Sequence, residues 1–574
     1  MSLPQGGGAV QPTGETLRNN AVTGTGSFSV PVALSPGRSG LGPKLSLSYD
    51  SGSGNGPFGH GWSVGISSVR RRTSKGLPQY DDAVAGRTES DVFVLAGAED
   101  LVPMRDELGV VITRSQTAMI QSVSVAFTVQ RFRPRVQGAF ARVERWRRDD
   151  DGTVHWRTRD ADNVLRMYGH DPAGERNSRV VDPDDASRVF EWLLEEERDE
   201  VGNLVQTTYA VENRVGVASH PAEHARLQPG SACTHHYPKR IRYGNRTPSV
   251  ANNWPFELVF DYGEHTSDPP TAVKDGVWPV RSDPFSTFRP GFDPRCYRLC
   301  HRILMFHDFA EVGGSTLVRS TDLRYVQAPH LTKLMGVTHR GYRTESGTAT
   351  SLAMPEVSFE YLEPELGQDV ELVRGFDDVS PSFQIGEWQW VDLDGEGLTG
   401  LLTERAGARY YRRNEGDGEL GPIQVLRERP SAGLEGGQLM DLDGDGRLEL
   451  VSFRGPLQGD FDRGDDGRWE GFSGFDTPTD AEPGDPNVRL LDIDGDGLAD
   501  LVLTEENRLA WFKSRGRQGF DAPRYMPKGY DEQLGPTLVL QSDPESLFLA
   551  DMTGDGLTDL VQVRYGSICY PASC

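Results

Sequence analysis

The sequence predicts an all-β protein, in which a β-meander or sandwich domain is followed by a partial β-propeller. A nine-residue acidic loop recurs four times in the last third of the chain, at intervals of 49, 51 and 59 residues. Each copy runs into Leu-Val or Leu-Leu, and a period of this size is typical of propeller blades. Glycine (66) and proline (37) are frequent and no long apolar pattern has the helical period of 3.6 residues, so turns and short strands are expected.

Length and charge divide the chain into two regions. A chain of 574 residues exceeds one ordinary domain, and we predict an N-terminal β domain over residues 1–375 and about four repeats over residues 376–574. The second region holds 39 Asp and Glu against 18 Lys and Arg, a net charge of −21, which leaves −4 of the total −25 for the first region. This acidity argues against nucleic acid as a partner and favours cations or a basic protein surface.

The N-terminus and the cysteines bear on localisation. The opening residues MSLPQGGG contain neither a basic residue nor an apolar run, and no apolar span of 18 residues occurs. The sequence therefore predicts neither a secretory signal peptide nor a membrane helix. The five cysteines are an odd and sparse set, unlike a disulfide framework.

The first strands are expected within residues 24–50, where apolar side chains alternate with small or polar ones. A glycine-rich stretch over residues 49–62 follows. Neither a Lys-Ser/Thr pair nor a helix start comes after it, so a phosphate-binding loop is disfavoured. We expect tight turns that fold Phe58 and Trp62 onto a sheet.

The middle of the chain predicts a β-meander. Asp151-Gly152 lies between two alternating arms and predicts a hairpin, and Asp162-Asn163 predicts the next turn. Residues 190–209 are compatible with a short helix by composition. We prefer a hairpin that turns at Gly202-Asn203, because apolar and polar residues alternate beyond it.

Candidate zinc and catalytic motifs are weak. The clusters at residues 233–236 and 296–301 contain Cys and His but lack the CxxC-like spacing of zinc sites, and for Cys300 a buried thiol is preferred. Glu195 and Glu197 have the Glu-x-Glu spacing of ADP-ribosyltransferases, although acidic pairs are common on solvated faces. No hydrolase elbow, zinc-protease helix or nucleotide loop occurs. We therefore predict no catalytic residues.

The four acidic loops are the candidate metal sites. Hard cations such as Ca²⁺ take several oxygens at one centre, and glycines at positions 4 and 6 let the chain wrap around an ion. The spacing of side-chain oxygens at positions 1, 3, 5 and 9 resembles the FG-GAP/VCBS hairpin loop, and this resemblance implies that those positions surround one Ca²⁺. An EF-hand is excluded, because position 12 lacks Glu and no helix flanks the loops. The first copy, from Asp392, ends in Gly400 and is degenerate. The predicted ligands of the other three copies are Asp441, Asp443, Asp445, Glu449, Asp492, Asp494, Asp496, Asp500, Asp551, Thr553, Asp555 and Asp559. The alternative is that these side chains form Asx-turns without a metal.

Several stretches resemble a known family. Residues 35–62 read SPGRSGLGPKLSLSYDSGSGNGPFGHGW. Together with residues 22–32, 91–103, 190–196, 239–246 and 297–306, they resemble the SpvB/TcaC-type N-terminal domain of the B component of bacterial insecticidal toxin complexes, the Tc toxins. The loops resemble the FG-GAP/VCBS repeats of integrin-type propellers, in which one Ca²⁺ is held by each loop.

The resemblance implies a non-enzymatic subunit whose propeller docks on the pentameric A-component channel. In that family the rest of the B component forms, with the C component, a hollow Rhs-type shell around the toxic enzyme. The protein would be made in the bacterial cytoplasm and act outside the cell within the complex. Members of that family continue well beyond the length of this sequence, so we expect a fragment, a truncated gene product or a free-standing relative, with an incomplete ring of blades.

Two other functions stay open at this point. The loops alone would permit a calcium-dependent binding or adhesion module, which the long resemblance at residues 35–62 disfavours. A truncated relative of an SpvB-type ADP-ribosyltransferase is disfavoured because no catalytic domain follows the repeats.

Overall fold

A computed structural model shows two compact units, one formed by Met1–Thr73 and Pro78–Leu362 and the other by Ser74–Leu77 and Glu363–Cys574. The residues that the structure describes are 16–19, 25–73, 77–80, 91–95, 100–135, 142–220, 223, 226–228, 231, 233–310, 314–345, 348–362, 373–374, 388–393, 395, 397–405, 408–426, 437–453, 458–464, 468–479, 481, 485–494, 496–527, 547–552, 557–564 and 567–569.

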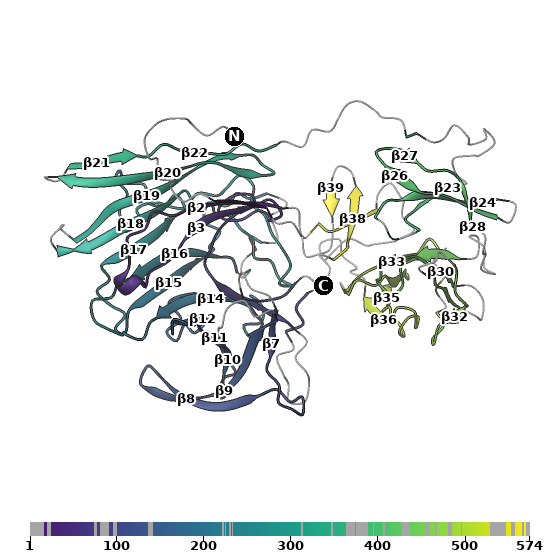
Figure 1. Ribbon diagram of the computed structural model, residues 1–574, viewed down its shortest axis with the longest axis horizontal. Helices are drawn as coiled ribbons and strands as arrows, with labels where there is room; N and C mark the ends of the chain where they lie inside the picture. The colour runs from purple at the N-terminus through teal and green to yellow at the C-terminus, as the bar shows by residue number, and fades with distance from the viewer. Residues whose placement is uncertain are drawn as a thin grey trace. The chain divides into compact units, whose positions relative to one another are not determined.

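The N-terminal unit consists of two antiparallel sheets (Figure 1). Strands β1 to β4 form a four-stranded sheet, and β5 to β22 form one large sheet whose hydrogen-bonded order closes on itself. The 3₁₀ turn η1 (Arg38–Gly40) lies between β2 and β3. The strands are β1 (Thr16–Asn19), β2 (Gly26–Pro31), β3 (Ser46–Asp50), β4 (Trp62–Val64), β5 (Ser68–Arg71), β6 (Phe93–Leu95), β7 (Asp100–Pro103), β8 (Thr113–Ile120), β9 (Val123–Pro134), β10 (Arg142–Arg148), β11 (Val154–Arg159), β12 (Leu165–Tyr168), β13 (Arg179–Val181), β14 (Val189–Arg198), β15 (Leu204–Val211), β16 (His236–Tyr243), β17 (Phe256–Asp261), β18 (Arg302–Phe309), β19 (Gly314–Gln327), β20 (Thr332–Glu345), β21 (Thr348–Ala353) and β22 (Val357–Ser358).

The predicted hairpins of this unit are confirmed. Strands β10 and β11 pair around Gly152, whose φ of +74° is readily adopted only by glycine. Asn163, at φ +61°, turns the chain from β11 to β12. Strands β14 and β15 pair around a turn that contains Gly202 at φ +86°, so residues 190–209 form a hairpin and not a helix.

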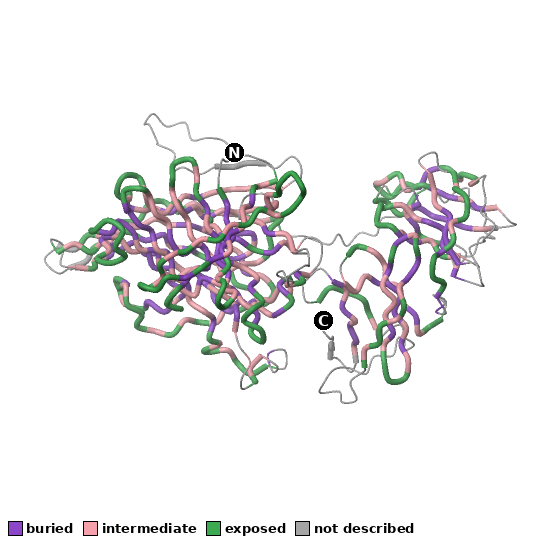
Figure 2. Tube along the Cα trace, turned by 90° about the horizontal axis from the view of Figure 1, so that it is seen from below, coloured by how far each residue is buried: buried purple, intermediate pink, exposed green. Residues whose placement is uncertain are grey.

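Large aromatic side chains fill the interior of the N-terminal unit. Phe93, Trp156 and Trp192 pack against one another with ring centroids 4.9 to 6.0 Å apart and are at most 1% exposed. Phe58 and Trp62 are each 3% exposed, as predicted for the glycine-rich stretch, and the Trp62 indole donates to the Tyr361 hydroxyl at 2.8 Å. Figure 2 shows that buried residues gather in the interior of this unit and that exposed residues lie mostly at its periphery.

Among the described residues, the C-terminal unit contains one small antiparallel sheet for each acidic loop and a separate two-stranded sheet over residues 414–416 and 419–420. The sheets of the first three loops have four strands, as propeller blades do, and three strands of the fourth are described. The all-β prediction is confirmed, whereas the arrangement of these sheets around an axis stays a prediction. The strands are β23 (Trp388–Val391), β24 (Gly400–Arg405), β25 (Ala408–Arg412), β26 (Asn414–Gly416), β27 (Glu419–Leu420), β28 (Gln424–Leu426), β29 (Gln438–Met440), β30 (Glu449–Ser452), β31 (Gly459–Phe461), β32 (Ser473–Gly474), β33 (Val488–Leu491), β34 (Asp500–Thr504), β35 (Arg508–Phe512), β36 (Arg524–Pro527), β37 (Leu547–Ala550), β38 (Asp559–Arg564) and β39 (Ser567–Cys569).

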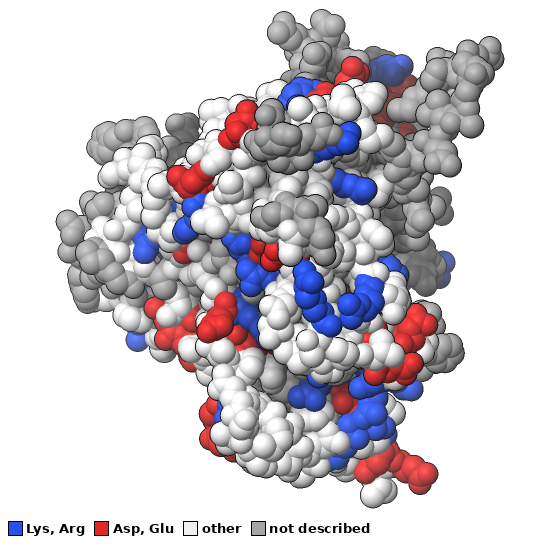
Figure 3. Space-filling model, turned by 90° about the vertical axis from the view of Figure 1, so that its left-hand side faces the viewer, with Lys and Arg blue, Asp and Glu red and all other residues white. Residues whose placement is uncertain are grey.

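Two surface properties are relevant to partners. Among the described residues, no helix has the length and apolar character needed to cross a membrane. Basic and acidic side chains are interspersed on the face shown in Figure 3. This face therefore carries charges of both signs.

Candidate functional site

Each acidic loop connects the first and second strands of its sheet, and in the first three loops backbone amides donate hydrogen bonds to the leading aspartate. Asp441 accepts hydrogen bonds from the amides of Gly444 at 2.7 Å and Gly446 at 2.9 Å. The equivalent Asp492 accepts from the Gly497 amide at 2.9 Å. Gly444 and Gly446 have φ values of +75° and +87°, so the glycines make the tight turn possible.

The carboxylate at position 9 is buried beneath each of the last three loops. Glu449, Asp500 and Asp559 open the second strands of their sheets and are at most 1% exposed. Each accepts the backbone amide of loop position 2, at 2.8 Å for Glu449, 3.2 Å for Asp500 and 2.8 Å for Asp559. This repeated contact ties the start of the loop to its end.

Positions 1, 3 and 9 converge in the second and third loops. Oxygen atoms of Asp441, Asp443 and Glu449 lie within 4.8 Å of one another, and so do those of Asp492, Asp494 and Asp500. Ligands at opposite sides of one Ca²⁺ are separated by about 5 Å, so both groups fit such an ion. The position-5 residues, Asp445 and Asp496, do not belong to these groups.

Burial raises the pKa values of the position-9 carboxylates in these two groups. Desolvation, helped by the charge of Asp443, raises the pKa of Glu449 to about 7. The pKa of Asp500 is also raised, again chiefly by burial. A cation bound between the carboxylates would oppose this effect, because it favours their ionised forms.

The two loops differ in the cations that the chain itself supplies. Lys513 forms ion pairs with Asp494 and, at 3.0 Å, with Asp496. The strand register places Asp462 at the equivalent point of the preceding sheet, because Leu450 pairs with Phe461 as Leu501 pairs with Phe512. The second loop therefore has an extra carboxylate where the third has an ammonium group.

Arg517 partly compensates for this extra charge, binding Asp462 at 2.6 Å and Asp460 at 3.0 Å. Asp460 is fully buried, and its Oδ1 accepts no hydrogen bond from the residues that the structure describes. None of these residues was predicted from the sequence. Comparing the repeats beyond the loop itself, as far as the end of the third strand, would have revealed the Asp462 and Lys513 difference.

The first and fourth loops provide less complete groups. A side chain at Gly400 would meet the Arg412 carbonyl oxygen at 2.4 Å, so there is no space for a carboxylate at position 9 of the first loop. In the fourth loop, Asp551 is exposed and Asp559 is buried. Thr553 and Asp555 lie outside the described residues.

A further acidic group, not predicted from the sequence, lies in the N-terminal unit. Side-chain atoms of Asp261, Glu264 and His265 lie within 4.8 Å of one another. Lys239 contacts Glu264 and lies 3.1 Å from His265 Nε2, while Arg302 donates to Asp261 at 2.8 Å. The protein therefore neutralises this group with its own cations.

The residues of the weak motifs have structural partners. Cys296 and Cys300 are fully buried, and their thiols contact the backbone oxygens of Arg298 and Arg302, which confirms the buried thiol expected at Cys300. Glu195 is fully buried as well. Burial opposes its ionisation, but hydrogen bonds from His170 and Ser178 and the charge of Arg176 outweigh that effect and lower its pKa.

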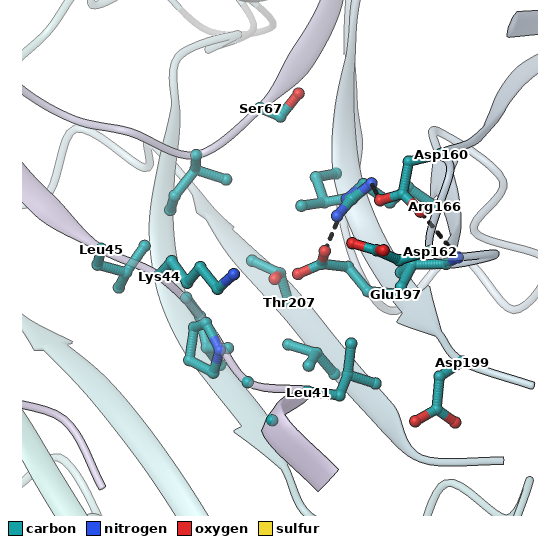
Figure 4. Close-up of a pocket in the computed structure, with 18 of the residues that line it drawn as sticks. Leu41, Lys44, Leu45, Ser67, Asp160, Asp162, Arg166, Glu197, Asp199 and Thr207 are labelled. Atoms are coloured by element: carbon teal, nitrogen blue, oxygen red, sulfur yellow. Dashed lines mark hydrogen bonds and ion pairs between the residues drawn. The ribbon is translucent and has the colours of Figure 1, made fainter. Parts of the chain in front are cut away.

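A cavity of about 590 Å³ lies between the loop after η1 and the hairpins around β12 and β14 (Figure 4). Arg166 binds both Asp160 and Glu197 at 2.7 Å on one wall, and Lys44 extends from the opposite wall. The pKa of Asp160 is lowered, because the bonds from Arg166 and the Val164 amide outweigh desolvation. Asp160 therefore stays ionised and is poorly suited to donate a proton.

Sequence comparisons identify relatives of both regions. The family described as Salmonella virulence plasmid 65kDa B protein matches residues 20–309, and the FG-GAP-like repeat family matches residues 492–561. The mono(ADP-ribosyl)transferases SpvB of Salmonella typhimurium and Salmonella dublin are each 35% identical over 351 residues, which cover 58% of this chain and 55% of theirs. The chain thus spans about half the length of these relatives.

Solved structures match almost the whole chain. A chain of the Photorhabdus luminescens Tc holotoxin pore has a TM-score of 0.81 at 29% identity, covering 99% of this chain and 26% of that chain. The TcdB2–TccC3 complex matches with a TM-score of 0.66 at 28% identity, covering 98% of this chain and 30% of that chain. The resemblance to Tc toxin B components is thereby confirmed. Because its family match spans half of the sequence, the chain belongs to the SpvB family, that of the Salmonella virulence plasmid 65kDa B protein.

Proposed function

We propose that this chain is a non-enzymatic subunit of a Tc-type toxin complex that acts outside the producing cell. The observation that carries the proposal is the match of 99% of the chain to one chain of a Tc holotoxin pore. The matched region covers only 55% of the length of the SpvB transferases. Their named activity can therefore reside in the part that this chain does not match. Glu195 and Glu197 have the spacing of a transferase motif, but each carboxylate forms an ion pair with an arginine. These ion pairs support a structural role for the two residues.

Within that complex, the acidic repeats dock on the A-component channel, and a Rhs-type C component is the second partner. A net charge of −21 over residues 376–574 would attract a basic channel surface and accelerate association. Association of the full chain with a cognate channel protein, followed by surface plasmon resonance, should slow as NaCl rises, because exposed charges are screened beyond about 8 Å at physiological ionic strength. In a pull-down, retention of full binding by residues 1–375 and none by residues 376–574 would refute this assignment.

The loop at residues 441–449 is the principal Ca²⁺ site in this proposal, held by Asp441, Asp443 and Glu449. The loop at residues 492–500 would bind more weakly, because Lys513 already occupies Asp494 and Asp496. The ion would connect the start and end of the loop and stabilise its sheet.

Calorimetric titration with Ca²⁺ tests the two loops separately. Asp443→Ala should abolish the tighter binding event, and Asp494→Ala the weaker one, each lowering the stoichiometry by about one. Lys513→Ala should strengthen the weaker event, while Lys274→Ala, in the N-terminal unit, serves as the charge-matched control. If the unmutated chain takes up no Ca²⁺, the loops are Asx-turns only.

A further inference from the structure

Strands β10 and β11 bring several charged side chains to one face of the large sheet. Residues two apart on a strand share a face, so Arg142 and Glu144 lie beside Arg157 and Arg159. The register pairs Glu144 with Arg157 on one side and with Arg131 on the other. A single carboxylate is therefore surrounded by arginines.

A cavity of about 230 Å³ opens among these residues. Four arginines line it, with Glu144 as the one carboxylate of the lining: Arg114, Arg142, Arg157 and Arg159. The volume is several times the roughly 30 Å³ that one water occupies, so a small oxyanion can enter. The lining carries a formal charge of +3, because it combines four guanidinium groups with one carboxylate.

Glu144 accepts hydrogen bonds from side chains other than Arg157 and Arg159. It is 6% exposed and accepts hydrogen bonds from Arg114 at 2.7 Å, from Arg142 Nε at 2.5 Å and from the Trp146 indole at 3.2 Å. Within the described part of the chain, its two oxygens form no ion pair with Arg157 or Arg159, although its charge attracts the nearby Arg157. The surplus positive charge of the cavity thus lies on these two side chains.

Among the described residues, the hydrogen-bond and ring partners of Arg157 and Arg159 are uncharged. The Arg157 guanidinium lies 3.6 Å from the centroid of the Trp146 ring, and its Nε donates to His155 Nε2 at 3.0 Å. Arg159 donates to the Asn163 side-chain oxygen at 2.5 Å. Within the described part of the chain, neither guanidinium forms an ion pair with a carboxylate.

We propose that this cavity binds a phosphate group. Guanidinium forks match the oxygens of phosphate in geometry and bind them through charge-assisted hydrogen bonds. A phosphate group carries a charge of about −1.5 to −2 at pH 7. It therefore balances the cavity's charge of +3 better than a ligand with one carboxylate group would. The site is independent of the acidic loops and of any docking on a channel.

Calorimetric titration of the full chain with inorganic phosphate, in a chloride-poor buffer, tests the proposal. Arg157→Gln should weaken binding about tenfold, the size expected for losing a charge-assisted hydrogen bond. Arg159→Gln should weaken it as well, and it provides a second variant should Arg157→Gln fail to fold. Arg147→Gln is the matched control, since Arg147 is an exposed residue of the neighbouring strand β10, does not line the cavity, and the change in charge is identical.

The competing outcomes are distinct. Tighter binding of N-acetyl-phosphoserine amide than of inorganic phosphate would identify a phosphorylated partner as the source, and the reverse would identify the free ion. Equal weakening by all three variants would show general electrostatic attraction and overturn the proposal, as would preferential binding of acetate.

Discussion

Buried ion pairs hold distant segments of the N-terminal unit together. Arg298 and Glu212, 86 positions apart, are 0% and 4% exposed and are joined at 2.6 Å. Glu212 also accepts the Tyr237 hydroxyl at 2.9 Å. Removing one member would leave the other charge buried without its partner.

Glu212→Gln should therefore lower the free energy of unfolding by about 3 to 5 kcal/mol. Replacing both residues, as Glu212→Gln with Arg298→Met, should cost less than the sum of the single changes, because no unpaired charge is left. Urea denaturation of the four proteins in this cycle measures the coupling. Strictly additive losses would mean that the pair contributes no stabilisation of its own.

His155 makes the stability of the N-terminal unit sensitive to acid. It is 3% exposed, packs against Trp146 and His170, and accepts a hydrogen bond from Arg157. Desolvation and the neighbouring positive charges hold its pKa well below the usual 6.5. The folded protein therefore contains neutral His155 at pH values where the unfolded chain takes up a proton.

Stability from this residue should be fully present above pH 6.5 and decline as the pH falls below it, by at most about 1.4 kcal/mol per pH unit. His155→Gln should remove that part of the pH dependence. Urea denaturation of both proteins from pH 5 to 8 measures it, and identical slopes would exclude His155 as the cause.

At the level of elements, glycine allows some turns to lie close to core side chains. Gly169, which follows β12, and Gly174, in the next connection, have similar φ values of +65° and +69°. A side chain at Gly169 would meet Trp192 at 2.3 Å, whereas one at Gly174 would meet nothing within 4 Å. An alanine at Gly174 would therefore experience backbone strain alone, whereas an alanine at Gly169 would experience backbone strain and a steric clash.

Gly174→Ala should cost about 1 to 2 kcal/mol, the penalty for a left-handed alanine. Gly169→Ala should cost more, because the buried Trp192 must also move. Denaturant titrations of both variants compare the two losses, and equal values would show that the core at Trp192 relaxes without cost.

The elements also show where local sequence information suffices. The hairpins at Gly152 and Gly202 and the shape of the acidic loops depend on residues a few positions apart, so spacing alone predicts them. The basic residues that pair with carboxylates of these loops and of their sheets lie in the connection after β35. Lys513 and Arg517 reach their carboxylates only after the strands have paired.

For the whole molecule, the uneven charge should make the two units respond differently to salt. A net charge of −21 over residues 376–574 destabilises a compact state through self-repulsion, whereas −4 over residues 1–375 has little effect. Calorimetry of the full chain from about 20 to 500 mM NaCl should show a C-terminal transition that rises with salt and an N-terminal transition that barely moves, since salt of this concentration screens exposed charges. Parallel shifts of both transitions would contradict this view.

The sequence by itself determined the all-β class, the repeat period, the turns and the acidic loops, because each depends on composition or on spacing within about ten residues. Tertiary structure decided which charges meet. It placed Arg157 and Arg159 beside Glu144, which is hydrogen-bonded to other arginines. It also placed Lys513 beside the third acidic loop and Asp462 at the equivalent point of the second. These contacts follow from strand register and burial, which bring together residues far apart in the chain and set the cost of leaving a charge unpaired.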